Sequence, residues 1–114
     1  MHLSDYQTAA LRTLNRALTA DEQLLDAAAG LAEEAGEVLG LVRKHRFQGR
    51  PLDRAAVVEE LGDVLWCLAA LAARLGVTLD DVAETNLAKL RRRHPDGLTA
   101  PPARPEGLGS DDLH

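Results

Sequence analysis

The sequence is poor in aromatic residues and in cysteine. It holds one Phe, one Tyr and one Trp among 114 residues, and Cys67 is its single cysteine. Strands draw on aromatic and β-branched residues, whereas the apolar residues here are mostly Leu, Ala and Val, so the composition favours helices over sheets. A single cysteine excludes an intrachain disulfide.

The chain also lacks an apolar run of membrane-spanning length and a signal-peptide pattern. We therefore expect a cytoplasmic protein without a membrane partner. The formal net charge is -5, which argues against a general nucleic-acid surface. Basic residues nevertheless gather at 43–54 and at 89–93, and such clusters in an acidic protein suit a small anionic ligand.

Four amphipathic segments predict an all-α fold. The expected helices cover about 4–18, 21–45, 53–76 and 79–95. Ser4, followed by Gln7 three residues later, predicts a capping box for the first helix. Asp53 and Thr78 are the expected N-caps of the third and fourth helices, and Gly76 is expected to end the third. Short connections between the helices predict a four-helix bundle.

The second and third helices are longer and more apolar than a small monomeric bundle needs, so we expect a homodimer or a homotetramer.

Gly30, Gly36 and Gly40 interrupt the second helix, where each Gly costs roughly 1 kcal/mol relative to Ala. They suggest close approach of another backbone. Pro and Gly become frequent after residue 95, which predicts a helical domain at 1–95 and a tail at 96–114.

Two carboxylate clusters lie inside the second and third expected helices, EEAGE at 33–37 and EELGD at 59–63. Residues three apart share one face of a helix, which pairs the acids within each cluster: Glu34 with Glu37, and Glu60 with Asp63. The residues four positions after these acids are Val38, Leu41, Val64 and Cys67. No basic residue of the same helix therefore neutralises the acids, whereas a plain solvated face tends to supply one.

Unpaired acids held close together are unfavourable unless a cation joins them. Ligands that are all oxygen select Mg²⁺, Mn²⁺ or Ca²⁺ rather than zinc. No His follows either acid pair by three residues, which argues against a ferritin-like di-iron site. Carboxylate-bound Mg²⁺ leaves positions for water and substrate phosphates, so the acids predict phosphoryl or pyrophosphoryl chemistry. Glu33 and Glu59 point further towards solvent, and Glu59 is expected to be ordinary surface.

The fourth expected helix adds Asn86 within its apolar arc, with Lys89 and Arg93 on the edge of that arc. A buried Asn needs hydrogen-bond partners, and a cationic edge suits phosphate oxygens. The alternative is an Asn satisfied by backbone and a basic helix end favoured by the helix dipole. Trp66, the single Trp, is expected either to stack on a nucleobase or to lie in the core or an interface.

The stretch from Gly30 to Pro95 resembles the MazG-like nucleotide pyrophosphohydrolases of the all-α NTP pyrophosphatase superfamily. The matching pattern is Glu-x-x-Glu, a spacer and Glu-x-x-Asp, followed by NLAKLRRRHPDG at 86–97. The Tyr-Gln pair at positions 6 and 7 and the basic run at 44–46 in the spacer also suit the family.

The resemblance implies Mg²⁺-dependent hydrolysis of a nucleoside triphosphate to a monophosphate and pyrophosphate, with water attacking the α-phosphorus and Mn²⁺ as a possible substitute. It implies an oligomer whose sites can use more than one chain. It also implies roles for particular acids and polar residues: Glu34, Glu37, Glu60 and Asp63 as metal ligands, Glu33 or Glu34 as the group that orients or deprotonates water, and Asn86 and Lys89 as substrate contacts.

Two alternatives stay open at this stage. One is a related enzyme of the same superfamily, such as a dimeric dUTPase, a dCTPase or a phosphoribosyl-ATP pyrophosphohydrolase. The other is a helical oligomer that binds nucleotide or metal without turnover.

Overall fold

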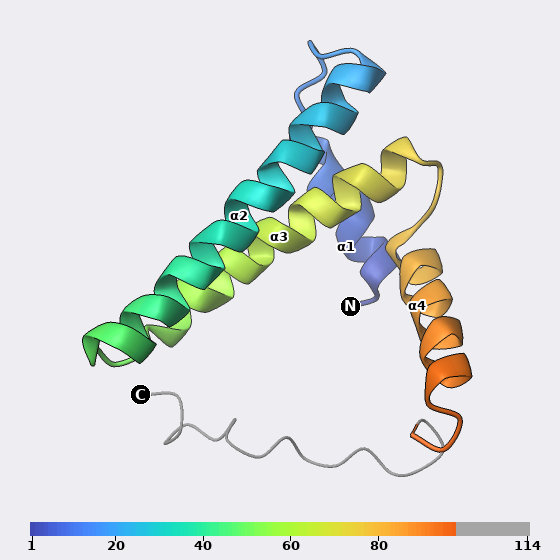
Figure 1. The fold of residues 1–114 in the computed structure, drawn as a ribbon. Coiled ribbons are helices and arrows are strands. Elements are labelled where there is room, and N and C mark those ends of the chain that lie inside the picture. The colour runs from blue at the N-terminus through green and yellow to red at the C-terminus, as the bar shows by residue number, and fades with distance from the viewer. Residues whose placement is uncertain (98–114) are drawn as a thin grey trace.

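A computed structural model describes residues 1–97, and these form four α-helices and one short 3-10 helix without a strand (Figure 1). The elements are α1 (Leu3–Ala10), η1 (Leu11–Thr13), α2 (Ala20–Gln48), α3 (Arg54–Arg74) and α4 (Leu79–Arg93). The all-α prediction is confirmed. None of these helices is long and apolar enough to cross a membrane. Beyond Gly97, the expected tail lies outside the described residues.

The predicted N-caps of the third and fourth helices are confirmed. Asp53 Oδ1 accepts a hydrogen bond from the Ala56 amide at 3.0 Å. Thr78 Oγ1 accepts from the Asp81 amide at 3.0 Å, and the Asp81 carboxylate accepts from the Thr78 amide at 2.9 Å. Gly76 follows α3 with a φ of 74°, a left-handed conformation that favours glycine. Local side-chain chemistry therefore fixes where these two helices begin and where α3 gives way to α4.

The prediction for the first helix is wrong at both ends. The helix begins at Leu3 after His2, which takes the N-cap position expected for Ser4. It ends at Ala10, and only one further turn of 3-10 helix follows before the chain leaves the helical conformation, well short of Leu18.

A contact from α3 explains this early end. The Trp66 indole Nε1–H donates to the Ala10 carbonyl at 3.2 Å and to Thr13 Oγ1 at 2.8 Å. In a longer α-helix the Ala10 carbonyl would accept from the Leu14 amide, but that amide bonds to Leu11 instead and Leu14 adopts a ψ of 140°. A residue 53 positions further along the chain thus helps to set the end of α1.

Gln7 does not belong to the capping box of α1, where Asp5 takes the predicted place of Gln7. Gln7 is instead buried, at 6% exposure. Its Nε2 donates to the carbonyls of Ala69 and Val77 at 3.1 and 3.3 Å. Its Oε1 accepts from the Leu79 amide at 3.0 Å. One side-chain amide therefore joins α1 to the end of α3 and the start of α4, and all these groups are satisfied without water.

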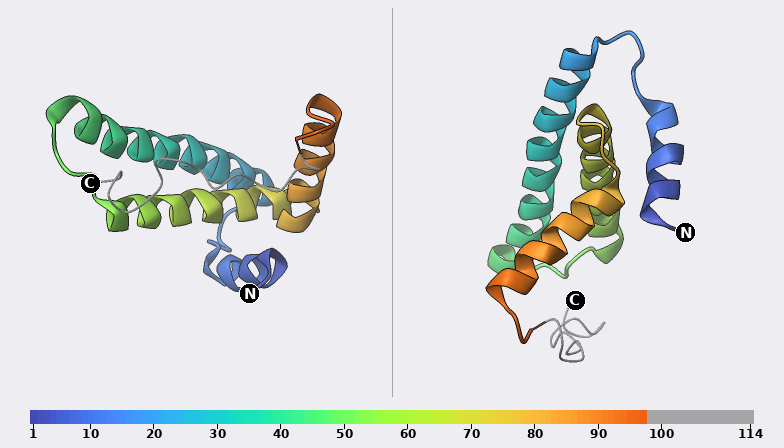
Figure 2. Two further views of the ribbon diagram at one scale, coloured as in Figure 1. Left: turned by 90° about the horizontal axis from the view of Figure 1, so that it is seen from below. Right: turned by 90° about the vertical axis from the view of Figure 1, so that its right-hand side faces the viewer.

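The helices α2 and α3 form an antiparallel hairpin, and α1 and α4 lie on and beyond its α3 side (Figures 1 and 2). In the described chain α4 contacts α1 and α3 but not α2. Among the described helices only α3 packs against α2, so no helix within residues 1–97 covers the other faces of α2.

The core of the protomer consists mainly of small side chains. Its buried apolar residues are Ala27, Cys67, Ala69, Ala70, Ala72 and Leu79. Small residues bring the helix backbones close together. At Gly30 a Cβ atom would lie 3.1 Å from Cys67 Sγ, so the close neighbour there is a side chain and not the predicted backbone. At Gly36 and Gly40 a Cβ atom would meet open space, so neither shows such an approach within the described chain.

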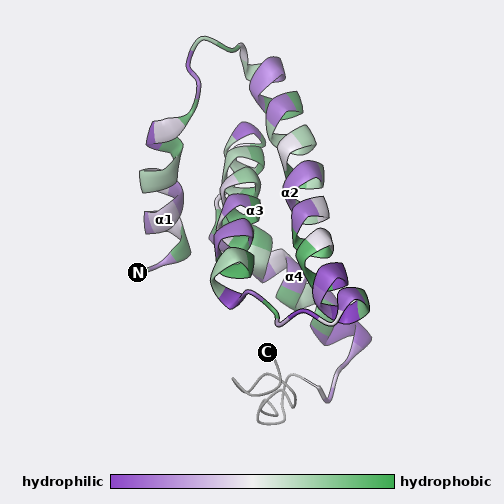
Figure 3. Ribbon diagram, turned by 90° about the vertical axis from the view of Figure 1, so that its left-hand side faces the viewer, coloured by the Kyte–Doolittle hydropathy of each residue, from purple (hydrophilic) through white to green (hydrophobic). Residues whose placement is uncertain are grey.

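Large apolar side chains remain exposed on α2 and α3. On α2, three of them belong to a row spaced alternately by three and four residues, which we call the outer stripe: Leu25, Ala28, Ala32, Ala35, Leu39 and Val42. Leu24 and Phe47 are also exposed on α2 but lie outside this row. Leu25 is 71% exposed and Leu39 is 55% exposed. On α3, Val58, Leu61 and Leu68 are also exposed, as is Leu75 directly after the helix. Hydrophobic and hydrophilic residues alternate along both helices in Figure 3. An apolar row with this spacing is typical of a helix that packs against a further helix.

Candidate metal centre

Three of the predicted metal ligands lie together between α2 and α3. Carboxylate oxygens of Glu34, Glu37 and Glu60, one from each residue, lie within 4.8 Å of one another. Glu34 and Glu37 share a face of α2 because they are three residues apart, and the packing of α3 brings Glu60 against that face. We call these three residues the acid cluster.

The acid cluster contains two polar atoms without a partner. Glu34 Oε2 and Glu60 Oε2 are both buried, and neither makes a hydrogen bond in the described chain. Buried polar atoms nearly always have partners, because losing water without replacing its hydrogen bonds is unfavourable. The two oxygens therefore mark a position where a cation or a proton is needed.

The two neighbouring acids raise the pKa of Glu60, so its negative charge is disfavoured. The pKa rises from an ordinary 4.5 to about 7, first because the protonated carboxyl can hydrogen-bond to Glu34 and then because it can hydrogen-bond to Glu37. Loss of water and repulsion by the same two acids raise it further. No basic side chain of the described chain offsets these effects on Glu60.

The donor set fits a hard divalent cation. All the side-chain ligands of the acid cluster are carboxylate oxygens, which suit Mg²⁺ or Mn²⁺, and neither His nor Cys is among them. A cation between the helices would give both unpartnered oxygens a ligand and would remove the repulsion that raises the pKa of Glu60.

A cavity of about 320 Å³ adjoins the acid cluster, and we call it the first cavity. Its lining includes the predicted site residues Glu33, Glu34, Asp63 and Trp66. Asp63 is not in the acid cluster. Because α2 and α3 run antiparallel, Asp63 lies on the side of Glu33, while Glu37 lies on the other side of Glu34. Glu34 is thus common to the acid cluster and the first cavity.

A second cavity, of about 380 Å³, lies on the opposite side of the acid cluster. Glu37 and Glu60 line it together with Lys44 and Glu59. Glu59 is exposed, as expected, but it faces a cavity rather than plain surface. Lys44 gives this side of the site a cation, whereas the charged residues of the first cavity are all acidic.

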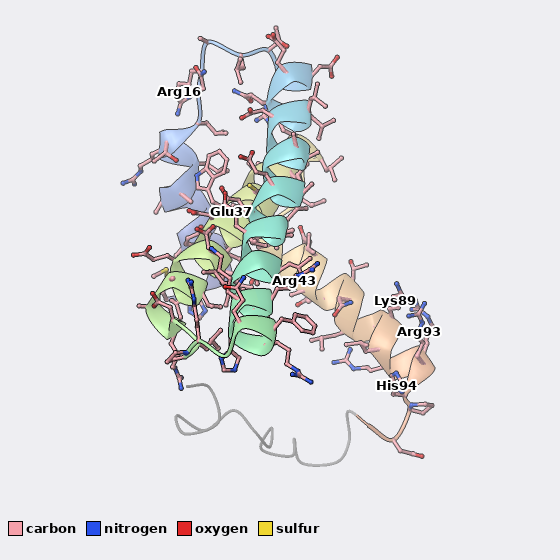
Figure 4. The ribbon with its side chains drawn as sticks, turned by 60° about the vertical axis from the view of Figure 1, so that its left-hand side comes forward. Arg16, Glu37, Arg43, Lys89, Arg93 and His94 are labelled. Atoms are coloured by element: carbon pink, nitrogen blue, oxygen red, sulfur yellow. The ribbon has the colours of Figure 1, made fainter. Side chains whose placement is uncertain are left out.

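The predicted contacts on α4 lie apart from the acids within one protomer. Asn86, Lys89 and Arg93 are exposed and line neither cavity. Figure 4 shows Lys89 and Arg93 on α4, away from Glu37. The expected burial of Asn86 in its own protomer is wrong, because α4 packs only against α1 and α3.

One residue near the site was not found from the sequence. Asp26 lines the first cavity, seven and eight residues before Glu33 and Glu34, which places it two turns earlier on the same side of α2. That spacing is the signal that could have found it. Tyr6, which the sequence marked only as part of the Tyr-Gln pair, also lies near the site: burial first, and then Asp63 and Cys67, raise the pKa of its phenol. Tyr6 is therefore close enough to sense the charge of Asp63.

Comparison with known proteins gives a family match over most of the chain. The sequence profile of the MazG nucleotide pyrophosphohydrolase domain matches residues 22–98. The gene 37 protein of Mycobacterium phage L5 is 36% identical over 106 residues, which cover 86% of this chain and 93% of that protein. The uncharacterized protein YvdC of Bacillus subtilis (strain 168) is 36% identical over 72 residues, covering 55% of this chain and 68% of that protein. No solved structure matches the chain.

Proposed function

The chain belongs to the MazG nucleotide pyrophosphohydrolase family, and from this premise we propose that it is a Mg²⁺-dependent enzyme that hydrolyses an NTP or dNTP to the monophosphate and pyrophosphate. The observation that carries the proposal is the acid cluster with its two buried, unpartnered carboxylate oxygens. Such an arrangement stabilises a fold poorly by itself but suits a cation that binds phosphate.

The acid cluster would hold the cation, with Asp63 as a further ligand from the side of the first cavity. When bound, Mg²⁺ or Mn²⁺ supplies positive charge for phosphate oxygens and lowers the pKa of a water molecule. Glu34 belongs both to the acid cluster and to the wall of the first cavity. In this proposal it binds the cation at the point where the cavity meets the acid cluster.

Glu33 is the candidate for orienting the attacking water. It lines the first cavity but is not in the acid cluster, so its carboxylate is available to accept a proton. In the proposed reaction a bond forms between the water oxygen and the α-phosphorus. The bond from the α-phosphorus to the bridging oxygen breaks, and pyrophosphate leaves with that oxygen. Lys44, in the second cavity, is placed to meet part of the negative charge of pyrophosphate.

The proposed enzyme is a homodimer or a homotetramer. The support is the outer stripe of α2, whose apolar residues have no neighbouring helix among residues 1–97 of the same protomer. Asn86, Lys89 and Arg93 line neither cavity of their own protomer, so in this proposal they contact the substrate bound to another copy.

The test is incubation of the protein with a panel of NTPs and dNTPs in MgCl₂, with the products separated by ion exchange. We expect nucleoside monophosphate and pyrophosphate in equal amounts, and no reaction in EDTA. Glu37→Gln and Asp63→Asn should each abolish turnover while the helical circular dichroism is kept. Release of orthophosphate and nucleoside diphosphate would contradict the proposal, because it would show cleavage between the β- and γ-phosphates instead of between the α- and β-phosphates.

The same panel separates the two alternatives. Inclusion of dUTP, dCTP and phosphoribosyl-ATP distinguishes this activity from those of related all-α pyrophosphatases. A non-catalytic oligomer would yield no product from any of these compounds.

A further inference from the structure

The first cavity offers hydrogen-bond acceptors but no free strong donor among its lining side chains. Its four charged residues are all acids: Asp26, Glu33, Glu34 and Asp63. The one indole N–H in its wall, that of Trp66, already donates to Ala10 and Thr13. The remaining lining residues are Ala29, Gly30 and Cys67, and a thiol is only a weak donor. The proposed function assigns Glu34 and Asp63 to the cation and Glu33 to the attacking water. Asp26 is therefore the charged acceptor left for a nucleoside, which must supply the donor itself.

The residues of α2 that line the cavity lie at different distances from the acid cluster. Glu34, at one end, belongs to the acid cluster, where the phosphates would lie. Asp26 lies eight residues earlier on α2, which is about 12 Å along the helix axis from Glu34. Asp26 therefore lines the part of the first cavity that is furthest along α2 from the acid cluster, on the side away from the proposed phosphate position.

We propose that the first cavity receives the nucleoside and selects a base with an exocyclic amino group, which donates to the Asp26 carboxylate. Cytosine and adenine carry such a group, whereas uracil and thymine carry a carbonyl oxygen at the equivalent edge. A carbonyl facing a carboxylate leaves two acceptors in contact without a proton between them, so a site built in this way rejects the analogue. The orientation of the nucleotide in this inference rests on the proposed function, because it places the phosphates at the acid cluster.

The test uses the single Trp of the chain as a reporter. Because the Trp66 ring lines the first cavity and its N–H is held by Ala10 and Thr13, a base entering the cavity should quench its fluorescence. Titration of the Mg²⁺-loaded protein with CMP and with UMP should give quenching at CMP concentrations about tenfold lower, since one hydrogen bond to a charged group is gained. In turnover, kcat/KM should favour CTP over UTP by a similar factor.

The informative variant is Asp26→Asn, which keeps the size of the side chain and adds an amide donor. It should reduce the preference for cytosine over uracil to about threefold or less, because the amide can donate to the uracil carbonyl. Asp21→Asn is the matched control, since it removes a charge from the first turn of the same helix without touching the cavity. It should keep the full preference.

Three results would overturn the inference: equal quenching by CMP and UMP, no quenching by either, or an Asp26→Asn protein with an unchanged preference. Absence of NTP hydrolysis by the wild type, together with a CMP preference that depends on Asp26, would overturn the proposed reaction and support the nucleoside site. NTP hydrolysis without a CMP preference would support the proposed reaction and overturn the nucleoside site. Circular dichroism of Asp26→Asn confirms that the comparison is made on a folded protein.

Discussion

Glu34 and Glu60 lie across the α2–α3 interface from each other, and each has a buried Oε2 atom that no hydrogen bond satisfies in the described chain. Glu37 adds a third carboxylate to the same position. Close packing of three acids without a base opposes folding. The α2–α3 interface therefore gains from a bound cation, and its stability should depend on pH.

We expect the metal-free protein to lose stability as the pH rises. The folded state keeps a proton on Glu60 up to a pKa of about 7, whereas the unfolded chain loses it near 4.5. Between these values the folded state binds more protons, so the contribution is full below the lower pKa and is lost as the pH rises through the upper one. The melting temperature in EDTA, measured from about pH 5 to about pH 8, should fall.

Two comparisons check the origin of this pH dependence. Addition of MgCl₂ at the higher pH should raise the melting temperature, because the cation replaces the proton. Glu60→Gln should flatten the pH dependence, stabilise the metal-free protein near neutral pH and weaken the response to Mg²⁺. A Glu60→Gln protein with the same pH profile as the wild type would show that another group is responsible.

Gln7→Ala should destabilise the protein through the junction of α1, α3 and α4. It leaves the carbonyls of Ala69 and Val77 and the Leu79 amide without their side-chain partner. Loss of such buried bonds lowers the free energy of unfolding by about 3 kcal/mol. Urea denaturation measures this change.

Gln23→Ala is the matched control for Gln7→Ala. The Gln23 side chain donates one exposed bond, to the Asn15 carbonyl at 3.1 Å. Water can replace that bond, so the loss should be about 1 kcal/mol or less. Equal losses in the two variants would contradict the role assigned to Gln7.

The glycines of α2 should respond in opposite directions to alanine. Gly36→Ala should raise the free energy of unfolding by about 0.5–1 kcal/mol, because the new methyl group enters open space and Ala favours a helix. Gly30→Ala should lower it, because the new Cβ would lie 3.1 Å from Cys67 Sγ in the core.

The Cys67→Ala background separates crowding from other effects. With the sulfur removed, Gly30→Ala should become stabilising relative to Cys67→Ala alone, as a double-mutant cycle would show. If Gly30→Ala remains destabilising in that background, contact with the sulfur is not its cause.

Leu39→Glu should dissociate the proposed oligomer. Leu39 is 55% exposed in the protomer and belongs to the outer stripe, so in the proposed oligomer a charge there would be buried between copies. Sedimentation should show a dimer or tetramer for the wild type and a smaller species for Leu39→Glu. Gln48→Glu, at the exposed end of the same helix, is the control and should keep the wild-type mass. A monomeric wild type at micromolar concentration would contradict the assembly.

Much of this fold could be predicted because local chemistry specifies it. The caps at Asp53 and Thr78 bond to amides three residues away, and the glycine at 76 supplies the left-handed conformation after α3. The pairing of Glu34 with Glu37 follows from helical periodicity alone. The predicted ends of α3 and α4 and the grouping of acids therefore needed no knowledge of distant residues.

By itself, the sequence determined the helical class, the start and end of the later helices, and three of the four paired carboxylates that lie between α2 and α3, those of the acid cluster. Only the tertiary structure decided the partners of Gln7, 62 to 72 residues away, and the Trp66 contact that accompanies the end of α1. The tertiary structure also decided that Asp63 lines the first cavity and that α4 does not contact α2 in the described chain. The physical reason is that capping and periodicity act within a few residues, whereas these features depend on how whole helices pack.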